Sequence, residues 1–364
     1  MSRAAQLYFT CIYSLVGIGI VMTYSASAVY ADQIYDSSFY FLIRQAIFTL
    51  VGTFFLYGAA AIPPFFWKKN ARALILISMA MMLLVFVPGL GREAGGAKRW
   101  IHLGPVNFQP VEFAKIAVCI YLADYLSRKI KVIQRGQILV FFPPLLLIGL
   151  ICCLSLLQPD LGSCAFLALL TGLLYFLVGV HLRYVLIAVG MFVPILYFLV
   201  IKVPYRMSRI TAYLNPWEDP QGSGFQMIQS LLAFGLGAWK GVGLGLSTQK
   251  LFYLPSAYND FVFSILGEEL GFVGIFFVWA MFVTILICGI MMARRTSDNF
   301  NKLLILSVTF LFVFQAILNM MVATGLLPTK GLPLPFIGYG GTSIVVNLMA
   351  VGIVLGVDMQ SNRG

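Results

Sequence analysis

The 364-residue chain contains little charge and few of the side chains that usually bind metals. Only 10% of its residues are charged, with 24 Lys and Arg against 13 Asp and Glu. Its two histidines, His102 and His181, stand apart in the sequence, and we assign neither a catalytic nor a metal role. The six cysteines all fall in apolar runs without metal-ligand spacing and are expected to be small buried hydrophobes: Cys11, Cys119, Cys152, Cys153, Cys164 and Cys288. No metal site is therefore predicted.

What the chain has in abundance is apolar sequence, at 60% hydrophobic residues and a mean hydropathy of +0.94. Runs of about 18 or more such residues can cross a hydrocarbon core of about 30 Å as helices. Helices are expected because lipid leaves every backbone polar group to be satisfied within the segment. The composition thus predicts an all-α polytopic membrane protein. We predict ten spans, at about residues 8–29, 40–62, 71–88, 110–127, 138–157, 161–180, 182–201, 260–292, 302–324 and 341–358.

The loop charges predict the orientation of the chain. The segments at 67–72, 127–135 and 293–302 are rich in Lys and Arg, whereas the loop at 31–38 is acidic. Because cytoplasmic loops carry an excess of Lys and Arg, both termini are expected in the cytoplasm. The net charge of +11 is then explained by these loops and lipid headgroups rather than by nucleic acid. No cleavable signal peptide is apparent.

Two long outward segments, 89–109 and 202–259, also carry net positive charge. Long loops translocate largely regardless of charge, which is one explanation. Alternatively, these cations meet an anion at the outer leaflet, such as a lipid phosphate or diphosphate. The second segment is expected to be a large structured loop between the seventh and eighth spans, with a short amphipathic helix at 225–234. Its glycine run at 235–245 suits close packing and lacks the spacing of a nucleotide-binding motif.

Acids are concentrated where the eighth span begins. Asp260 is either the N-terminal cap of that helix or a general base at the outer membrane surface. Glu268 and Glu269 follow at an axial distance of about 12 Å, beyond the spacing of about 5–9.5 Å between glycoside hydrolase carboxylates. A hydrolase built from these acids alone is therefore disfavoured. We expect both glutamates to hold the helix and the loop together, with Arg or Lys partners.

Other polar residues interrupt apolar segments. Glu112 and Lys115 lie three residues apart on one helical face, where they can neutralise each other or take part in chemistry. Arg44, inside the second span, requires a carboxylate or lipid phosphate, and Glu112 is a candidate partner. The segment 325–343 is rich in Pro and Gly and is expected to form a rigid outward turn that carries Lys330.

Five segments, in this order, resemble the SEDS family (shape, elongation, division and sporulation), and more its division branch than its elongation branch. They are GAKRWIHLGPVNFQPVEFAK, LLQPDLG, YRMSRITAYLNPWEDPQGSGFQMIQSLLAFG, QKLFYLPSAYNDFVFSILGEELG and GLLPTKGLPLPFIGYGGTS. The resemblance implies one transmembrane domain over residues 1–364, with ten helices. It implies a peptidoglycan glycosyltransferase that polymerises lipid II at the outer face of the bacterial cytoplasmic membrane, at the division septum. Where the family commonly has Pro-Glu-Ala-His-Thr-Asp, this chain has PSAYND at 255–260.

The resemblance also assigns roles to residues and implies partners. Asp260 matches the family's essential aspartate, and Glu112 and Lys115 match a cavity-lining pair. The positions that match a diphosphate site are Arg44, Arg206, Lys250 and Lys330. The implied partners are a class B penicillin-binding protein (a transpeptidase) and other division proteins, and the implied cofactor is at most a divalent cation, Mg or Mn.

Two other functions remain open from the residues. A lipid II flippase or transporter would use Arg44, Glu112 and Lys115 as a polar pathway through the membrane midplane. A non-catalytic scaffold for a transpeptidase would not depend on Asp260.

Overall fold

In the computed structural model of the chain, the apolar runs form long helices. The structure describes residues 1–94, 97–104, 106–181, 183–184, 186–187, 190, 194, 197, 201–251, 254–255 and 257–361. Its α-helices are α1 (Arg3–Tyr35), α2 (Tyr40–Ala61), α3 (Pro64–Leu84), α4 (Pro110–Gln134), α5 (Phe142–Leu157), α6 (Leu161–Leu177), α8 (Pro204–Leu214), α9 (Phe225–Gly237), α10 (Val262–Arg295), α11 (Asn299–Ala323) and α12 (Gly341–Ser361). Two short 3₁₀ helices are η1 (Ile138–Phe141) and η2 (Pro216–Glu218).

Each predicted span except one overlaps a helix of this list. The exception, 182–201, lies mostly outside the described residues. Within the described part of the chain, six helices are long and apolar enough to cross a membrane: α1, α2, η1 with α5, α10, α11 and α12. The helix α4 carries three charged residues that are buried inside the protein, Glu112, Lys115 and Asp124.

A small sheet corrects the expectation of an all-α protein. Residues 91–108 form three antiparallel strands in the order β1 (Gly91–Ala94), β2 (Ala97–Leu103) and β3 (Val106–Phe108). Strands are possible here because this segment is polar and falls between apolar spans, where water can satisfy the free edges. Ile101 on β2 pairs with Phe108 on β3, and its buried side chain attaches the sheet to the rest of the protein.

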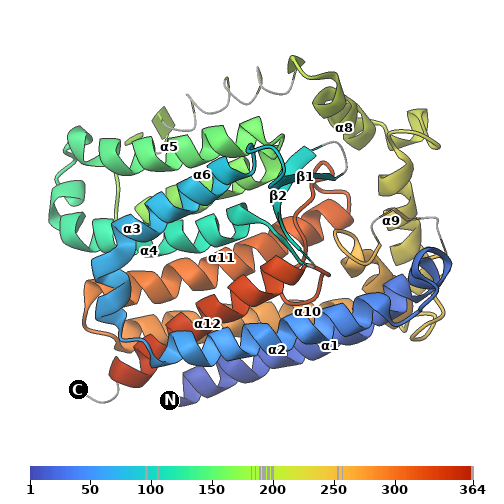
Figure 1. Cartoon of the computed structure of the whole chain (residues 1–364), viewed down its shortest axis with the longest axis horizontal. Helices are drawn as coiled ribbons and strands as arrows, with labels where there is room; N and C mark the ends of the chain where they lie inside the picture. The colour runs from blue at the N-terminus through green and yellow to red at the C-terminus, as the bar shows by residue number, and fades with distance from the viewer. Residues whose placement is uncertain are drawn as a thin grey trace.

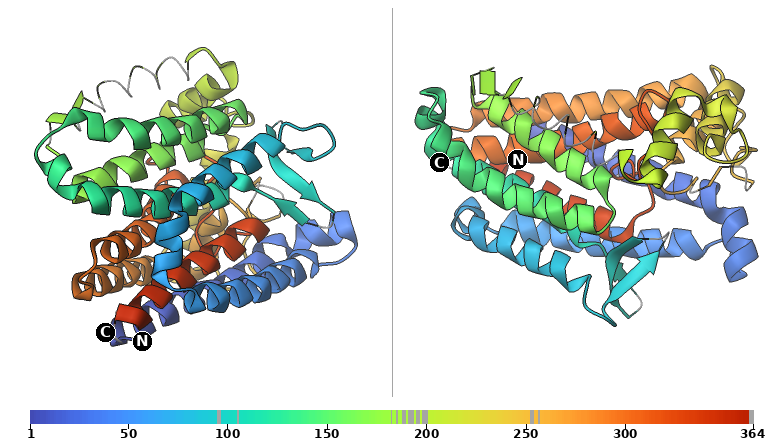
Figure 2. Two further views of the ribbon diagram at one scale, coloured as in Figure 1. Left: turned by 60° about the vertical axis from the view of Figure 1, so that its left-hand side comes forward. Right: turned by 90° about the horizontal axis from the view of Figure 1, so that it is seen from above.

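The chain ends meet at one end of the helix bundle (Figures 1 and 2). The Ser2 backbone N–H and hydroxyl donate to the Asp358 carboxylate over 2.8 and 2.7 Å. The first turns of α3 and the start of α11 are joined by the ion pair between Lys68, on α3, and Asp298, which caps α11, at 4.0 Å. The strands, α8 and α9 gather at the opposite end (Figure 1). The bundle therefore has two different ends, and the candidate site lies at the second.

Candidate functional site

Asp260 lies in the connection that leads into α10, not in the helix. The residue that precedes α10 is Phe261, and no side chain caps the helix there. The interpretation of Asp260 as a helix cap is therefore wrong. Its backbone carbonyl accepts a hydrogen bond of 2.8 Å from Nδ2 of Asn319 on α11. Its carboxyl group lies against Gly331, where an added Cβ would be 3.5 Å from Asp260 Oδ2.

Charged residues from distant segments surround the Asp260 carboxyl. Removal from water raises the pKa of this group to about 7, and Arg209 and Arg99 oppose that shift. Asp160 raises the pKa further by like-charge repulsion. Arg99 comes from β2, Asp160 precedes α6 and Arg209 lies on α8. Sequence reasoning did not select these three residues, because only the tertiary fold brings them together, although all lie in segments that resemble the family.

These charged groups are held by hydrogen bonds to neighbouring elements. Arg99 Nε donates to the Gln158 carbonyl over 3.1 Å, and Arg209 Nη1 donates to the Thr329 carbonyl over 3.0 Å. Asp160 caps α6, accepting from the Ser163 backbone N–H at 3.0 Å and its hydroxyl at 2.8 Å. These hydrogen bonds thus fix two guanidinium groups and a second carboxylate whose charges act on Asp260.

Lys330 and Arg206 approach the same region. Lys330 is partly buried, and removal from water lowers the pKa of its ammonium group. An added Cβ at Gly162 would lie 4.0 Å from Lys330 Cβ, which puts the lysine beside the start of α6. Arg206 lies on α8 one turn before Arg209, and its charge acts on Cys164 together with that of Lys330. The structure thus brings Asp260, Lys330 and Arg206 toward one end of the bundle.

Glu112 and Lys115 form a buried ion pair. Lys115 Nζ lies 2.8 Å from Glu112 Oε1, and the side chains are 1% and 4% exposed. Lys115 also donates to Gln315 Oε1 over 3.2 Å and lies 5.4 Å from the centre of the Phe166 ring. Neutralisation within the pair, one of the two sequence interpretations, is what the contacts show.

Arg44 has different neighbours from those predicted. Its guanidinium lies over the Tyr40 ring at 4.6 Å. Burial raises the pKa of Tyr339, and the positive charge of Arg44 opposes that rise. The prediction that Glu112 is the partner of Arg44 is wrong, because Glu112 is paired with Lys115. Tyr339 donates its backbone N–H to the Tyr258 carbonyl over 3.0 Å, so Tyr339 links the surroundings of Arg44 to the segment just before Asp260.

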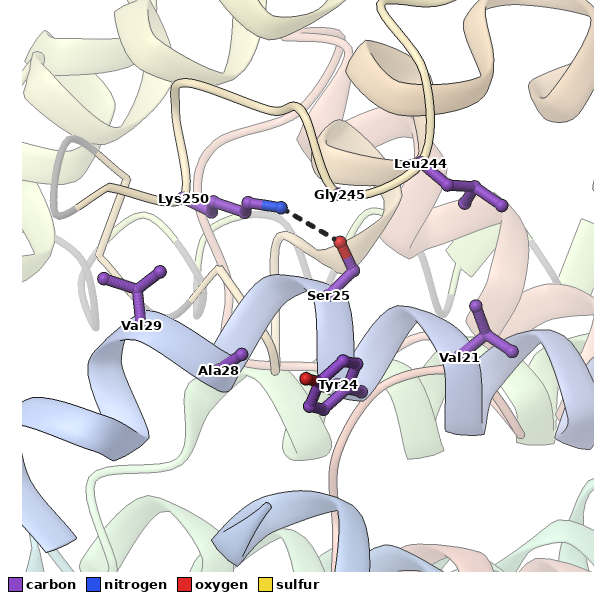
Figure 3. A pocket seen from close by; sticks show the side chains of 8 residues that line it. All are labelled: Val21, Tyr24, Ser25, Ala28, Val29, Leu244, Gly245 and Lys250. Carbon is purple, nitrogen blue, oxygen red and sulfur yellow. Dashed lines mark hydrogen bonds between the residues drawn. The ribbon is translucent and has the colours of Figure 1, made fainter. Parts of the chain in front are cut away.

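Lys250 lines a cavity of about 390 Å³ between α1 and the loop that follows α9 (Figure 3). Its Nζ donates to Ser25 Oγ over 3.1 Å and pairs with Glu269 Oε1 at 2.9 Å. Glu269 also accepts from Ser25 at 2.6 Å and is fully buried. Lys250 is therefore neutralised by a glutamate on α10, and the expectation of a basic partner for Glu269 is confirmed.

The loop after α9 is bound to α10 at a break in that helix. Gly271 has φ 63° and ψ −164°, so the helix is interrupted there. The N–H groups of Val242 and Gly243 donate to the carbonyls of Glu268 and Glu269, both over 3.0 Å. The Glu268 carboxylate accepts from the Thr248 N–H at 2.8 Å and from the Ser247 hydroxyl. Both glutamates thus hold the loop on the helix, as predicted. Glu268 does so through Ser247 and Thr248, however, and not through the Arg or Lys partner that was expected.

The close packing expected for the glycines after residue 235 is also present. An added Cβ at Gly237 would lie 2.0 Å from the Gly267 carbonyl oxygen. At Gly241, which has φ +76°, it would lie 2.1 Å from the Glu269 carbonyl oxygen. Only glycine allows the backbones to approach this closely, so the loop is a packed element and not a tether.

The residues around Asp260 do not fit a resident divalent cation. Across the described part of the chain, no group of three or more His, Cys, Asp or Glu is placed to hold a metal. Asp160 already accepts two hydrogen bonds, and the positive charges of Arg99 and Arg209 act on Asp260.

Known proteins match this chain over nearly its whole length. The family of cell cycle proteins that groups FtsW, RodA and SpoVE matches residues 5–363. The "probable peptidoglycan glycosyltransferase FtsW" of Geobacter metallireducens is 45% identical over 350 residues, which cover 95% of this chain and 92% of that protein.

Two solved structures share the fold. A chain of a peptidoglycan synthase complex, described for its coordination of polymerization and crosslinking, is 28% identical with a TM-score of 0.80 and covers 98% of both chains. The rod shape determining protein RodA of Thermus thermophilus is 26% identical with a TM-score of 0.70, over 97% of this chain and 96% of that one. The helices of this chain are therefore arranged as they are in these solved proteins.

Proposed function

Because the chain belongs to the family of cell cycle proteins that includes FtsW, RodA and SpoVE, we propose that its charged end carries out glycosyl transfer, with Asp260 as the base. The protein is a peptidoglycan glycosyltransferase of the FtsW type. The proposed substrate is lipid II, which the protein polymerises into glycan strands. The observation that carries the role of Asp260 is its partly buried carboxyl group, with a pKa near neutrality, beside several fixed cations. A general base works best when its pKa is close to the working pH.

The proposed reaction is a displacement at the anomeric carbon of a lipid-linked donor. A sugar hydroxyl of the acceptor attacks that carbon, its proton passes to the Asp260 carboxylate, and the bond to the lipid diphosphate breaks. The leaving diphosphate carries negative charge, which Arg99, Arg206, Arg209 and Lys330 can stabilise. The donor groups in the described part of the chain do not form a site for a divalent cation, so the positive charge at the leaving group comes from these side chains.

The proposal gives different roles to three other groups: Lys250, Arg44 and the buried Glu112–Lys115 pair. Lys250 and Glu112–Lys115 are neutralised by partners within the protein. Arg44 lies beside Tyr40 and Tyr339 and, of the residues that the resemblance assigned to the diphosphate, is a further candidate besides Arg206 and Lys330. We therefore place the diphosphate nearer to Lys330 and the α8 arginines than the family resemblance alone implies.

The membrane arrangement belongs to the same proposal. One domain over residues 1–364 crosses the cytoplasmic membrane ten times, with both termini in the cytoplasm and residues 202–259 outside. The adjacent termini and the basic turns at their end of the bundle support this orientation. The active end then faces outward at the division septum.

A class B transpeptidase is the proposed partner, together with other division proteins. The support is the structural likeness to a chain of a synthase complex that couples polymerization and crosslinking. The two activities need proximity, since a crosslinking enzyme acts on the strand that a polymerase has just made.

The test compares the parent protein with Asp260→Asn, each purified alone and with a class B transpeptidase, on labelled lipid II. Asp219→Asn is the matched control, because Asp219 is an exposed acid whose carboxylate bonds to Ser223. We expect glycan strands on a gel from the parent and the control, and a loss of at least about 100-fold in Asp260→Asn.

Equal polymer from a folded Asp260→Asn would reject Asp260 as the base. If the parent made no polymer even with the transpeptidase, the flippase and the scaffold would become the better explanations. Transfer of labelled lipid II across vesicles containing the protein would then separate those two.

A further inference from the structure

Two amide side chains on α11 connect the buried ion pair to the segments that carry Asp260 and Lys330. Gln315 and Asn319 are four residues apart, so they lie one above the other on the same helical face. Both are almost completely buried, at 1% and 2% exposure. Neither belongs to the residues that sequence analysis selected.

Asn319 bridges two backbone segments. Its Nδ2 donates to the Asp260 carbonyl and to the Leu332 carbonyl, each over 2.8 Å. Asp260 precedes α10, so its carbonyl lies outside the hydrogen-bond ladder of that helix. Since both neighbours are acceptors, only the amide nitrogen can face them, which fixes the orientation of the Asn319 side chain.

Gln315 acts in the same way one turn earlier. Its Nε2 donates to the Pro333 carbonyl over 3.0 Å, while its Oε1 accepts from Lys115 Nζ over 3.2 Å. Lys115 is in turn held by Glu112. The ion pair thus sets which end of the Gln315 amide faces the Pro333 carbonyl.

We propose that Gln315 and Asn319 are positioning residues that hold the Asp260 connection and the 330–333 turn in fixed relative places. We call these two amide side chains the clamp. The buried Glu112–Lys115 pair then has a role that needs no contact with substrate, because it orients Gln315. Lys330 and Gly331 precede the clamped carbonyls, and Gly331 is the residue against which the Asp260 carboxyl lies. This inference rests on the proposed role of Asp260 as the base.

The effect of losing the clamp is expected in catalysis rather than in folding. A displacement of about 1 Å in a reacting group can lower a rate by about 100-fold. Asn319→Ser removes both amide N–H donors and leaves one hydroxyl donor on a shorter side chain, which cannot bridge the two carbonyls. Asn347→Ser is the matched control, because Asn347 is also a buried asparagine and its amide donates to Ser343 on its own helix.

The experiment measures kcat, KM for lipid II and the melting temperature of the full-length protein with its transpeptidase. For Asn319→Ser we expect kcat to fall about 30- to 100-fold while KM stays within about threefold, at a melting temperature close to that of Asn347→Ser. Asn319→Gln, which keeps both donors on a longer side chain, should recover part of the loss. If Asn319→Ser does not fold, Asn319→Asp replaces it, since it matches asparagine in size and has no donor when ionised and a single O–H donor when protonated, so it cannot bridge both carbonyls.

Parental kcat in a folded Asn319→Ser or Asn319→Asp would overturn the proposal, and so would an equal loss of kcat in Asn347→Ser. Asp260→Asn is measured in the same series. If Asp260→Asn is inactive while Asn319→Ser is normal, only the clamp is rejected. If Asp260→Asn is active, the base assignment fails, and the clamp fails with it.

Discussion

Burial and nearby charges act in opposite directions on the Asp260 carboxyl group. Removal from water raises its pKa to about 7, and two arginines limit the rise. A base must be ionised, so polymerisation should fall below this pH. We expect kcat/KM to drop about tenfold per pH unit below about pH 6.5, with a plateau above pH 8. Initial rates between pH 5 and 9 measure this, and a flat profile through pH 6 would contradict it.

Two substitutions should move that pH dependence in opposite directions. Arg209→Gln removes a cation that lowers the pKa of Asp260, so the acid limb should shift to higher pH. Asp160→Asn removes a like charge that raises the pKa, so the limb should shift to lower pH. Asparagine can still cap α6, which limits structural damage. Shifts in the same direction for both variants would show that structure, not charge, is responsible.

The sequence identified Asp260 and Lys330 through segments that resemble the family, but missed the other charged neighbours of Asp260. Arg99, Asp160 and Arg209 are far apart in the chain, and periodicity carries no information on which loops meet at one end of a bundle. The partner of Arg44 was misassigned for a related reason, since Glu112 had a closer cation one turn away on its own helix.

At the scale of elements, the ion pair between Lys250 and Glu269 joins the loop to α10. Both side chains are buried, and removing one partner leaves an uncompensated charge that costs about 3–5 kcal/mol. Lys250→Met should therefore lower the melting temperature clearly, while the double variant Lys250→Met/Glu269→Gln should regain most of the loss. Thermal unfolding in detergent tests this. An equally unstable double variant would contradict it.

The glycines of the loop give a second test at this scale. Gly241→Ala forces a side chain into a left-handed position and against the Glu269 carbonyl, at a cost of about 2 kcal/mol or more. Gly235→Ala, within α9, meets nothing within 4 Å and should be neutral or slightly stabilising. Melting temperatures of the two variants should therefore differ, and equal values would show that the loop is loosely packed.

Sequence reasoning predicted most of the helices but not the strands at 91–108. Helices of the spans follow from apolar length, a property of each segment alone. The strands depend instead on pairing between short polar stretches. Ile101 on β2 is buried, and its burial depends on the helices that pack against the sheet.

For the whole molecule, the two ends of the bundle should lie on opposite sides of the membrane. Lys69→Cys and Gln221→Cys place single thiols on exposed positions at the two ends, in a background without native cysteines. An impermeant maleimide applied to intact spheroplasts should label Gln221→Cys and leave Lys69→Cys unlabelled until the membrane is opened. The reverse pattern would invert the topology.

The break at Gly271 has a consequence for how α10 is solvated. At about 1.5 Å per residue, the 34 residues of α10 would extend about 51 Å, much more than a hydrocarbon core of about 30 Å. Residues 272–295 alone rise about 36 Å, enough to cross with some tilt. The lipid-crossing stretch can therefore begin after the break. Glu268 and Glu269 then belong to a short cap of helix on the membrane surface, and the bilayer never has to accommodate their charge.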